Sequence, residues 1–392
     1  MLRVLHVAPT PFFSDRGCHI RIEGIVRGLN SKGVHSTVCT YHHGREREGV
    51  ETIRIGGIDS YKETKAGPDP HKYMADIKLW WLVCKTIRKQ RPDVIHAHLH
   101  EGVLLGWAAK LAVFKPRLPL VADLQGSLVG ELDSYNYFEK SKGLRKVFMW
   151  LESTILRMPA HIFCSSVASL ALFRDDFDIP QDRMTLLSDR VEQRVVATRA
   201  PERDAGSPVT VIYSGALLQS KGLSQLLEVL ELLLSRRSGV RVVLVGYPTE
   251  AVASYLEGKG FGGNCVLTGR VNYENLPHHL AAADIGLDPK LPGAGEGSGK
   301  VLNYMAAGLP VVAFDSPNNR DFLGERQELV ADGSIEGFVA RIEHLIDHED
   351  IRRREGERNR QRALQDFTWE RGVEKILDQY ERLPGDSESA TR

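Results

Sequence analysis

A glycine-rich segment at residues 293–300 has the residue types best suited to chemistry. It reads Gly-Ala-Gly-Glu-Gly-Ser-Gly-Lys and leads directly into the apolar pattern of a helix at 300–308. Glycines before a helix leave backbone N–H groups accessible, and the helix dipole adds partial positive charge at that end. Because Lys300 adds a full charge, the segment predicts a binding site for a diphosphate.

The same segment does not match a Walker A loop. That motif needs glycine where Ala294 stands, and a magnesium-binding Ser or Thr where Val301 stands. The segment also comes too late in the chain to open a nucleotide-binding domain of that type. A solvated surface loop remains the simpler alternative for this segment taken alone.

A second glycine-bearing loop, residues 214–222, follows the apolar run Val209–Tyr213. It leads from that predicted strand into a predicted helix and places Lys221 at the helix start. A single lysine at a helix start is often only solvated. Two such loops in one predicted domain favour a shared role, so we expect Lys221 and Lys300 to bind one diphosphate.

In the first half of the chain, polar residues follow three predicted strands. Because the carboxyl ends of parallel strands meet at one edge of a sheet, we expect these polar strand ends to converge. A single alternating His-x-His on a strand is weak support for a metal site, and we expect no metal. The polar segments are Asp15–His19, the pair His96 and His98, the expected loop residues His100 and Glu101, and Asp123–Ser127.

The composition fits an ordinary globular chain of two domains. At 392 residues it exceeds one typical core, and Lys+Arg and Asp+Glu both number 51, so no overall field attracts nucleic acid or an anionic membrane. The five cysteines are scattered without a CxxC or Cys/His cluster, which is typical of reduced thiols rather than a zinc site. With no signal-peptide pattern and no apolar run of about 18 residues, we expect a cytoplasmic protein.

Short apolar runs alternate with helical patterns along the chain, which predicts an α/β fold with parallel sheets. The polar stretch Asp189–Pro208 divides them into two series, so we expect two doubly wound domains. An exposed loop within one large domain is the alternative. The apolar cluster Trp80–Cys84 is interpreted as one turn of a buried helix. The first series of strands is Val4–Ala8, Thr37–Thr40, Thr52–Ile55, Asp93–His98, Leu120–Asp123 and Ile162–Cys164; the second is Val209–Tyr213, Val240–Val245, Val266–Leu267, Ile285–Leu287 and Pro310–Phe314. The clearest helices are Gly17–Ser31, Lys72–Gln90, Gly102–Phe114, Leu223–Arg236, Lys300–Gly308 and Thr368–Leu383.

Six motifs in order resemble retaining glycosyltransferase family 4, and the likeness covers nearly the whole chain. They are the opening strand, glycine loop and helix at Val4–Leu29, Asp-Val-Ile-His-Ala-His at Asp93–His98, the phosphate loop at Gly215–Gly222, Ala282–Pro289, Tyr304–Ala313, and Phe-Thr-Trp-Glu at Phe367–Glu370. The resemblance implies a GT-B fold: two Rossmann-like domains facing across a cleft, with a C-terminal helix that crosses back to the N-terminal domain. It implies an acceptor-binding domain at 1–195, a nucleotide-sugar-binding domain at 208–367, and the crossing helix at 368–384.

Three positions depart from the family pattern. Ala216 stands where the family usually has Arg, so one bidentate clamp on the diphosphate is missing. The Glu–x7–Glu pair falls on Gly295 and Asn303, with Glu296 one position along, although Asn303 can still hydrogen-bond ribose hydroxyls. Gln125 stands where a histidine usually contacts the transferred sugar.

The resemblance implies a retaining, metal-independent sugar transfer from a nucleotide diphosphate-sugar, with no cofactor and no nucleic-acid partner. The acceptor is expected to be a lipid-linked or cell-surface glycan precursor. A non-catalytic binding partner of another transferase, or a sugar-nucleotide epimerase, are the alternatives. The residues it assigns are Lys221, Lys300, Gln125 and Glu296 for catalysis; Gly17, Gly215, Arg270, Val271, Gly297, Ser298, Gly299 and Asn303 for the donor; and His19, His98 and Asp123 on the acceptor side.

A basic segment within 139–158 predicts a contact with an anionic membrane surface, peripheral to the inner face of the cell membrane. An apolar stripe at helical spacing indicates an amphipathic helix, and three further apolar residues are expected to enter the headgroup layer. The alternative is that the stripe packs on the sheet and the cations are only solvated. The cations are Lys140, Lys142, Arg145 and Lys146; the stripe is Leu144, Val147, Leu151, Ile155 and Met158; the headgroup residues are Phe148, Met149 and Trp150.

Overall fold

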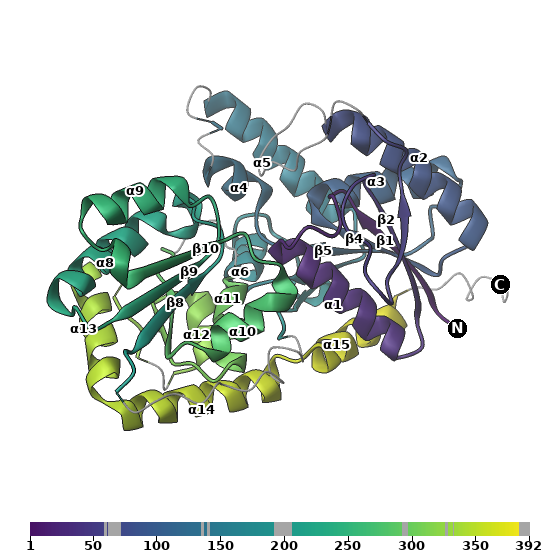
Figure 1. Ribbon diagram of the computed structural model, residues 1–392. Helices are drawn as coiled ribbons and strands as arrows, with labels where there is room; N and C mark the ends of the chain where they lie inside the picture. Colours follow the sequence, from purple (N-terminus) through teal and green to yellow (C-terminus); the bar gives the residue numbers. More distant parts are fainter. Residues whose placement is uncertain are drawn as a thin grey trace. The chain divides into compact units, whose positions relative to one another are not determined.

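The computed structural model divides the chain into two compact units (Figure 1). It describes residues 1–58, 61, 72–134, 137–138, 142–191, 206–291, 297–325, 328–331 and 333–383, with only the backbone of Ser134 and Lys142. The first unit contains the described residues of 1–188 and of 369–392, and the second contains those of 189–293 and of 297–368. Each unit is described by itself.

The first unit is built on a seven-stranded parallel sheet with the order β3-β2-β1-β4-β5-β6-β7. Side chains alternate between its two faces, so each strand supplies two separate cores. The strands are β1 (Arg3–Ala8), β2 (His35–Thr40), β3 (Glu51–Arg54), β4 (Val94–His98), β5 (Leu120–Leu124), β6 (His161–Cys164) and β7 (Met184–Leu186).

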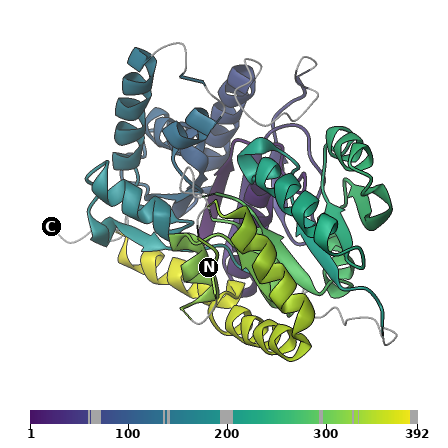
Figure 2. The same ribbon diagram turned by 90° about the vertical axis from the view of Figure 1, so that its left-hand side faces the viewer.

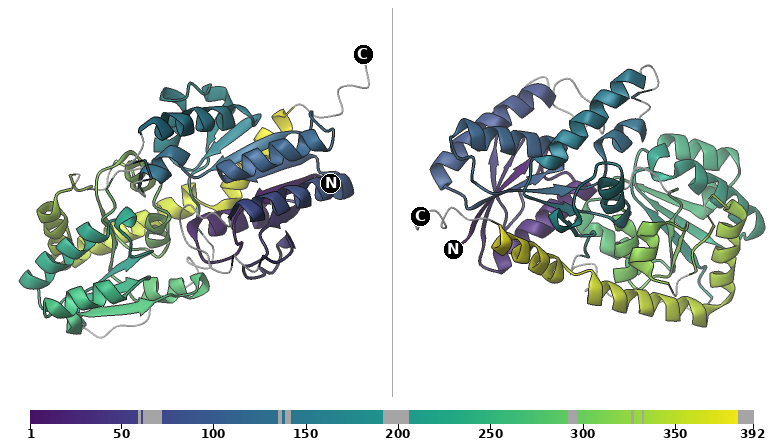
Figure 3. Two further views of the ribbon diagram at one scale, coloured as in Figure 1. Left: turned by 90° about the horizontal axis from the view of Figure 1, so that it is seen from above. Right: turned by 180° about the vertical axis from the view of Figure 1, so that it is seen from behind.

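One face of this sheet packs against α2 (Lys72–Gln90), α3 (Leu99–Ala112), α5 (Lys142–Arg157) and α6 (Val167–Asp175), which share one apolar core with Leu5 and Ile95. The opposite face packs against α1 (Gly17–Ser31) and α15 (Trp369–Arg382), with Val4 and Val94 in that core. The views in Figure 3 show these two helical layers on either side of the strands. The short helix α4 (Leu128–Ser134) contacts α5.

The last helix, α15, is anchored in the first unit by close packing on α1. The indole ring of Trp369 lies where a Cβ on Gly24 would stand, 2.0 Å from the ring, so only glycine fits beneath it. Farther along α15, the hydroxyl of Tyr380 lies 2.6 Å from Nδ1 of His96 on β4. The C-terminal segment of the chain therefore completes the core of the N-terminal unit.

The second unit is built on a five-stranded parallel sheet with the order β10-β9-β8-β11-β12, flanked by helices (Figure 2). Helix α8 packs with α13, and α11 packs with α12 and α14. The strands are β8 (Thr210–Ser214), β9 (Arg241–Val245), β10 (Cys265–Gly269), β11 (Ile285–Asp288) and β12 (Val311–Ala313). The helices are α8 (Leu223–Arg236), α9 (Glu250–Gly258), α10 (Leu276–Ala281), α11 (Gly299–Ala306), α12 (Pro317–Leu323), α13 (Ile335–Asp347) and α14 (Glu349–Asp366).

The expected fold class is confirmed: the chain forms two parallel sheets flanked by helices. The bounds of α1, α2 and α8 match the sequence prediction, because each helix has a strong apolar face and polar ends. Strand β7 was missed, since its three residues are too few to show alternation. Within the described residues, no helix is long and apolar enough to cross a membrane.

The unit boundary falls earlier than the expected end of the first domain at residue 195. Residues 189–191 already belong to the second unit. Val191 bridges to Thr368, and Arg190 donates a 2.6 Å hydrogen bond to the carbonyl oxygen of Asp366. These contacts hold residues 190–191, at the start of the second unit, against residues 366–368, at its end.

Three local expectations were wrong. Trp80–Cys84 is not wholly buried, because Trp81 is 63% exposed on the outer side of α2. His100 and Glu101 lie in the first turn of α3 rather than in a loop. On α5, Phe148 and Met149 pack against Val129 instead of facing outward.

Candidate functional site

Tyr213, at the end of β8, joins the two glycine-bearing loops of the second unit. Its hydroxyl lies 3.0 Å from the carbonyl oxygen of Ala216 and 3.3 Å from that of Lys221, so it can donate to either. The ammonium group of Lys300 lies 4.4 Å from the centre of its ring. The tyrosine therefore holds the first loop and the start of α11 together at the carboxyl edge of the sheet.

The ammonium of Lys300 is paired with a buried carboxylate. Its Nζ lies 3.2 Å from Oδ1 of Asp288, at the end of β11, and 3.4 Å from the hydroxyl of Tyr213. Burial opposes the charged form, but the Asp288 carboxylate and the neighbouring tyrosines outweigh it, so the pKa of Lys300 is raised. Lys300 is therefore a fixed positive charge, 13% exposed, at the start of α11.

Glycines let the backbone approach closely at this edge. Gly222 has φ +86°, and a Cβ there would lie 2.6 Å from the carbonyl oxygen of Pro289. A Cβ on Gly246 would lie 1.8 Å from the carbonyl oxygen of Gly215. Gly215 itself has φ +144° and lies beside the Lys300 side chain, where a Cβ would be 3.3 Å from Cε. Larger residues would push these segments apart.

Tyr304 fixes α11 to the ends of two strands. Its hydroxyl accepts a 2.7 Å hydrogen bond from the backbone N–H of Ser214, and lies 3.3 Å from the carbonyl oxygen of Leu287. Its ring covers Gly286, where a Cβ would be 2.5 Å away. Burial raises the pKa of this phenol, so it stays a neutral hydrogen-bonding group.

The start of α11 already has a carboxylate beside it. Oδ2 of Asp189 lies 3.1 Å from the position of a Cβ on Gly299, the first residue of the helix. Negative charge is favourable at a helix N-terminus, and the Asp189 carboxylate already supplies it there. Gly297 and Ser298 lead into this turn, while Glu296 lies outside the described residues.

The remaining donor-side residues lie on neighbouring segments of the second unit. Lys221 ends a short 3₁₀ turn before Gly222 and α8. Asn303 accepts a hydrogen bond of 3.3 Å from the hydroxyl of Tyr273. Arg270 is exposed and stacks over the ring of Tyr247 at 5.3 Å, and Val271 follows it. The structure thus brings Gly215, Lys221 and Lys300 together through Tyr213.

In the first unit, His98 and Asp123 form an internal network. Arg21 donates to both carboxylate oxygens of Asp123, with its shortest contact at 2.6 Å, and Nδ1 of His98 lies 3.2 Å from the same carboxylate. Burial opposes ionisation of Asp123, but Arg21 outweighs it and the pKa of the carboxyl is lowered. Both His98 and Asp123 have no exposed surface, so we interpret them as positioning residues beneath the expected acceptor side.

Three buried histidines stack beside this network. The ring centres of His96 and His98 lie 4.8 Å apart, and His6 stacks on both. Burial and the neighbouring histidines lower the pKa of His6 and His96 well below the usual value. His96, His98 and Asp123 also offer atoms within 4.8 Å of one another, as a metal would need. Because Arg21 already neutralises Asp123, a divalent cation there would meet a buried positive charge.

His19 and Gln125 have different surroundings. His19 is buried, with Nε2 2.5 Å from the hydroxyl of Thr10 and Nδ1 accepting from the backbone N–H of Ser14. Burial lowers the pKa of His19 to about 3, and Arg16 adds to the effect. The side-chain amide nitrogen of Gln125 is buried and has no hydrogen-bond partner among the residues that the structure describes. Gly17 is the first residue of α1, with open space where a Cβ would stand.

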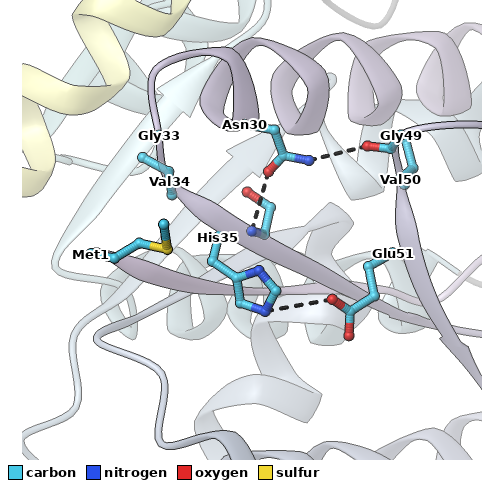
Figure 4. Close-up of a pocket in the computed structure, with 9 residues that line it drawn as sticks. Met1, Asn30, Gly33, Val34, His35, Gly49, Val50 and Glu51 are labelled. Carbon is cyan, nitrogen blue, oxygen red and sulfur yellow. Dashed lines mark hydrogen bonds and ion pairs between the residues drawn. The ribbon is translucent and has the colours of Figure 1, made fainter.

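A pocket of about 450 Å³ lies away from these residues (Figure 4). It is lined by Met1, His35 and Glu51, which lie at the amino-terminal ends of β1, β2 and β3. Asn30 there is already hydrogen-bonded to Gly49 and to the backbone N–H of Ser36. Since ligands of open parallel sheets bind at the carboxyl ends, this pocket is not the candidate site.

The sequence predicted Lys221 and Lys300 as site residues but not the residues that hold them. Tyr213 and Asp288 each end a strand next to a glycine-bearing loop, which was the only available signal. Tyr304 is the first residue of the motif Tyr304–Ala313, and the sequence assigns it no further role. Their roles depend on contacts between β8, β11 and α11 that no local pattern encodes.

Two family models match the chain in succession. The model described as "Glycosyl transferase 4-like domain" matches residues 16–190, and the model described as "Glycosyl transferases group 1" matches residues 197–362. Together they span both units, and the second contains every residue of the Tyr213–Lys300 arrangement.

Curated relatives and solved structures agree with these matches. The chain is 22% identical to the sulfoquinovosyl transferase SQD2 of Arabidopsis thaliana, over 96% of this chain and 72% of that one. It is 26% identical to the putative teichuronic acid biosynthesis glycosyltransferase TuaC of Bacillus subtilis, over 72% of this chain and 67% of that one.

Among solved structures, sucrose-phosphate synthase from Thermosynechococcus elongatus superposes with a TM-score of 0.78 at 15% identity, covering 98% of this chain and 99% of that one. Anabaena HepE in complex with UDP and glucose gives a TM-score of 0.73 at 16% identity, covering 98% and 100%. These structures share the fold.

Proposed function

The chain is a glycosyltransferase of the group 1 type with the GT-B fold, and on this premise we propose that it transfers a sugar from a nucleotide diphosphate-sugar to a lipid-linked or cell-surface glycan precursor. The observation that carries the proposal is the arrangement around Tyr213. One tyrosine brings a glycine-bearing loop with Lys221 and the start of α11 with Lys300 to one edge of a sheet. A diphosphate requires this combination of backbone N–H groups and fixed cations.

The donor diphosphate is proposed to bind beside Lys221 and Lys300, with the N–H groups at Ser298 and Gly299 directed to its oxygens. During transfer, the bond from the anomeric carbon to the diphosphate oxygen breaks, and a bond from the acceptor oxygen to that carbon forms. The proton of the acceptor hydroxyl passes to the leaving phosphate. Lys300 stabilises the charge that develops on this phosphate, because its position is fixed before the reaction begins.

The reaction is proposed to retain the anomeric configuration and to need no metal ion. The Lys300 ammonium is held charged by Asp288, so a protein cation can supply the neutralisation that a metal provides elsewhere. The leaving phosphate accepts the acceptor proton on the face from which it departs, which places the acceptor on that same face. Retention of configuration follows from that geometry.

Two observations support the choice of donor and acceptor class. Anabaena HepE, a protein of the same fold, was solved with UDP and with glucose, so uridine nucleotides are the first donors to test. The relative TuaC carries a name that refers to teichuronic acid biosynthesis, which supports a cell-surface glycan. We further propose that Gln125 donates its unpartnered amide N–H to a sugar oxygen, since a buried donor costs free energy until a ligand oxygen pairs with it.

We also propose that α5 meets an anionic membrane. Val147 and Trp150 are 57% and 68% exposed on this helix, beside the exposed Arg145 and Lys146. Arg145 is partly neutralised by Asp133 at 3.1 Å. Lys140 lies outside the described residues, as does the Lys142 side chain, and Phe148 and Met149 do not take part.

The proposal is tested by a donor panel followed by turnover. Thermal shift with nucleoside diphosphates should select one base, because a ligand at 100 times its dissociation constant stabilises a fold by about 2.7 kcal/mol. The matching nucleotide-sugar should then release nucleoside diphosphate only when a lipid or glycan extract is present. Nucleotide binding without release under any acceptor would instead indicate a non-catalytic binding partner, and conversion of the sugar without acceptor would indicate an epimerase.

A further inference from the structure

An apolar groove of about 470 Å³ lies between α2 and α3 of the first unit. Tyr73, Ile77 and Trp80 line it from α2, Leu104 and Trp107 from α3, and Met158 follows the end of α5. Its volume falls within the range of about 300–1,000 Å³ that small-molecule sites occupy. Asp76 is the one acidic residue among the described residues of the lining, and its carboxylate is hydrogen-bonded by the hydroxyl of Tyr41 at 2.5 Å. The groove therefore offers a ligand mainly apolar contacts.

Several large apolar side chains are exposed to solvent on the helices around the groove. Tyr73 is 72% exposed, Ile77 53% and Trp81 63%, at successive i, i+4 positions along α2. Phe114, just after α3, is 87% exposed. Exposed apolar patches of this kind mark interaction surfaces, and tyrosine and tryptophan are favoured where a membrane meets water.

Basic residues of α2 near the groove indicate which kind of ligand it binds. The chain as a whole is balanced, with 51 basic and 51 acidic residues, whereas α2 has five basic residues and one acidic. Lys85 and Arg88 follow Trp81 at i+4 and i+7, so they lie on the same outer face of the helix and both are exposed. An apolar groove next to a cationic face complements a lipid with a hydrocarbon chain and an anionic head group. An acidic or neutral rim would not favour that partner.

We propose that this groove is a lipid-binding site that seats a hydrocarbon chain of an anionic bilayer lipid, with Lys85 and Arg88 facing the head groups. The site lies on the same layer of the first unit as α5, because α2, α3 and α5 pack on one face of the sheet (Figure 3). This inference rests on the proposed function in that a lipid-linked acceptor requires access to a bilayer. Lipid binding itself needs neither nucleotide nor sugar transfer.

The groove makes a specific prediction for quenching of tryptophan fluorescence. Three of the five tryptophans, Trp80, Trp81 and Trp107, lie in or beside it, and Trp150 lies on α5. Vesicles of phosphatidylcholine and phosphatidylglycerol with brominated acyl chains should quench the wild-type fluorescence. Trp150→Phe removes the tryptophan of the α5 contact proposed above, and the fluorescence of this variant should still be quenched. Adding Trp80→Phe/Trp107→Phe to it should lower the remaining quenching. Quenching that Trp150→Phe alone abolishes would overturn the proposal and leave α5 as the membrane contact.

Co-sedimentation with unbrominated vesicles of the same composition gives a second, independent measurement. Ile77→Glu places a carboxylate in the groove, and Lys85→Glu/Arg88→Glu reverses its cationic side. The charge reversal should weaken binding about tenfold or more, because each cation near an anionic surface contributes roughly a factor of five. Ile77→Glu should weaken binding too, because it puts a carboxylate among apolar contacts and beside anionic head groups. Leu364→Ser is the control for an exposed apolar residue of the second unit, 39% exposed on α14, and should weaken binding less than Trp81→Ser.

The same variants separate this proposal from the proposed function. All of them should keep wild-type circular dichroism and wild-type affinity for the nucleoside diphosphate. Ile77, Trp81, Lys85 and Arg88 are exposed, and Trp80, which packs partly against the core, is replaced by another aromatic residue. Wild-type protein that fails to bind the vesicles, or Ile77→Glu that binds like wild type, would overturn the groove as a lipid site. If the wild-type protein binds vesicles but no nucleoside diphosphate, the proposed donor site is contradicted and the lipid-binding site is not.

Discussion

The ion pair between Lys300 and Asp288 allows donor binding and folding to be tested separately. Lys300→Ala removes a charge-assisted contact to the diphosphate, which should cost about 1.5–3 kcal/mol and weaken nucleotide binding roughly 10- to 150-fold. It also leaves Asp288, which is 1% exposed, as a buried and unpaired carboxylate. Breaking a buried pair in this way costs about 3–5 kcal/mol of folding free energy. The single variant therefore confounds the two effects.

A double variant, Lys300→Met/Asp288→Asn, removes both charges and nearly preserves the volume of both side chains. Replacing a buried pair by neutral groups is often close to neutral for stability, so its free energy of unfolding should lie within about 1–2 kcal/mol of wild type. Its nucleotide affinity should stay as low as that of Lys300→Ala, because the cation is absent in both.

Urea unfolding and isothermal titration with the best nucleoside diphosphate measure the two quantities. Lys221→Ala should also weaken nucleotide binding about 10- to 150-fold. Lys259→Ala is the matched control, since that lysine pairs with Glu231 away from the site and should leave affinity unchanged. Wild-type affinity in the stable double variant would refute the assignment of Lys300 to the diphosphate.

Three further predictions concern close packing and burial within the two units. Gly222→Ala should destabilise the fold by more than about 1 kcal/mol in urea unfolding, because φ is +86° and a Cβ would lie 2.6 Å from a carbonyl oxygen; Gly239→Ala, with open space around it, should not, and equal effects would contradict the steric argument. Burial lowers the pKa of His19 to about 3, so the unfolded chain binds its proton first and stability is lost as the pH falls below about 6.5. Near pH 5 that loss is about 2 kcal/mol, and His19→Gln should show a correspondingly smaller drop between neutral pH and pH 5; an unchanged drop would exclude His19 as its source. Gly24→Ala should lower the melting temperature, because a methyl group cannot share the space of the Trp369 ring, and an unchanged value would mean that α15 does not pack on α1 in solution.

The sequence predicted the fold well because its signals are local. The bounds of α1, α2 and α8 follow from apolar periodicity, and the strands of both sheets follow from short apolar runs flanked by polar residues. The outward position of Trp81 could not be predicted, since an apolar cluster between two lysines has the same pattern whether it is buried or exposed. Burial depends on which helices pack beside it.

The candidate site was predicted in part for the same reason. Glycines before helix starts and their lysines are visible in the sequence, so Lys221 and Lys300 could be proposed from it. Tyr213 and Asp288, which both contact the Lys300 ammonium, are 75 positions apart in the chain. Only the parallel pairing of β8 with β11 brings the ends of these two strands together. The burial of His98 and Asp123 was likewise invisible, because a polar strand end has the same sequence whether it faces a ligand or an arginine such as Arg21.

The central claim is that this chain moves a sugar from a nucleotide diphosphate donor held by Lys300. The most direct measurement is release of nucleoside diphosphate from the selected nucleotide-sugar in the presence of a lipid extract, for the wild type and for Lys300→Met/Asp288→Asn. We expect acceptor-dependent release by the wild type, and release by the stable double variant reduced at least about tenfold at donor concentrations below saturation. Equal release by the two proteins would contradict it.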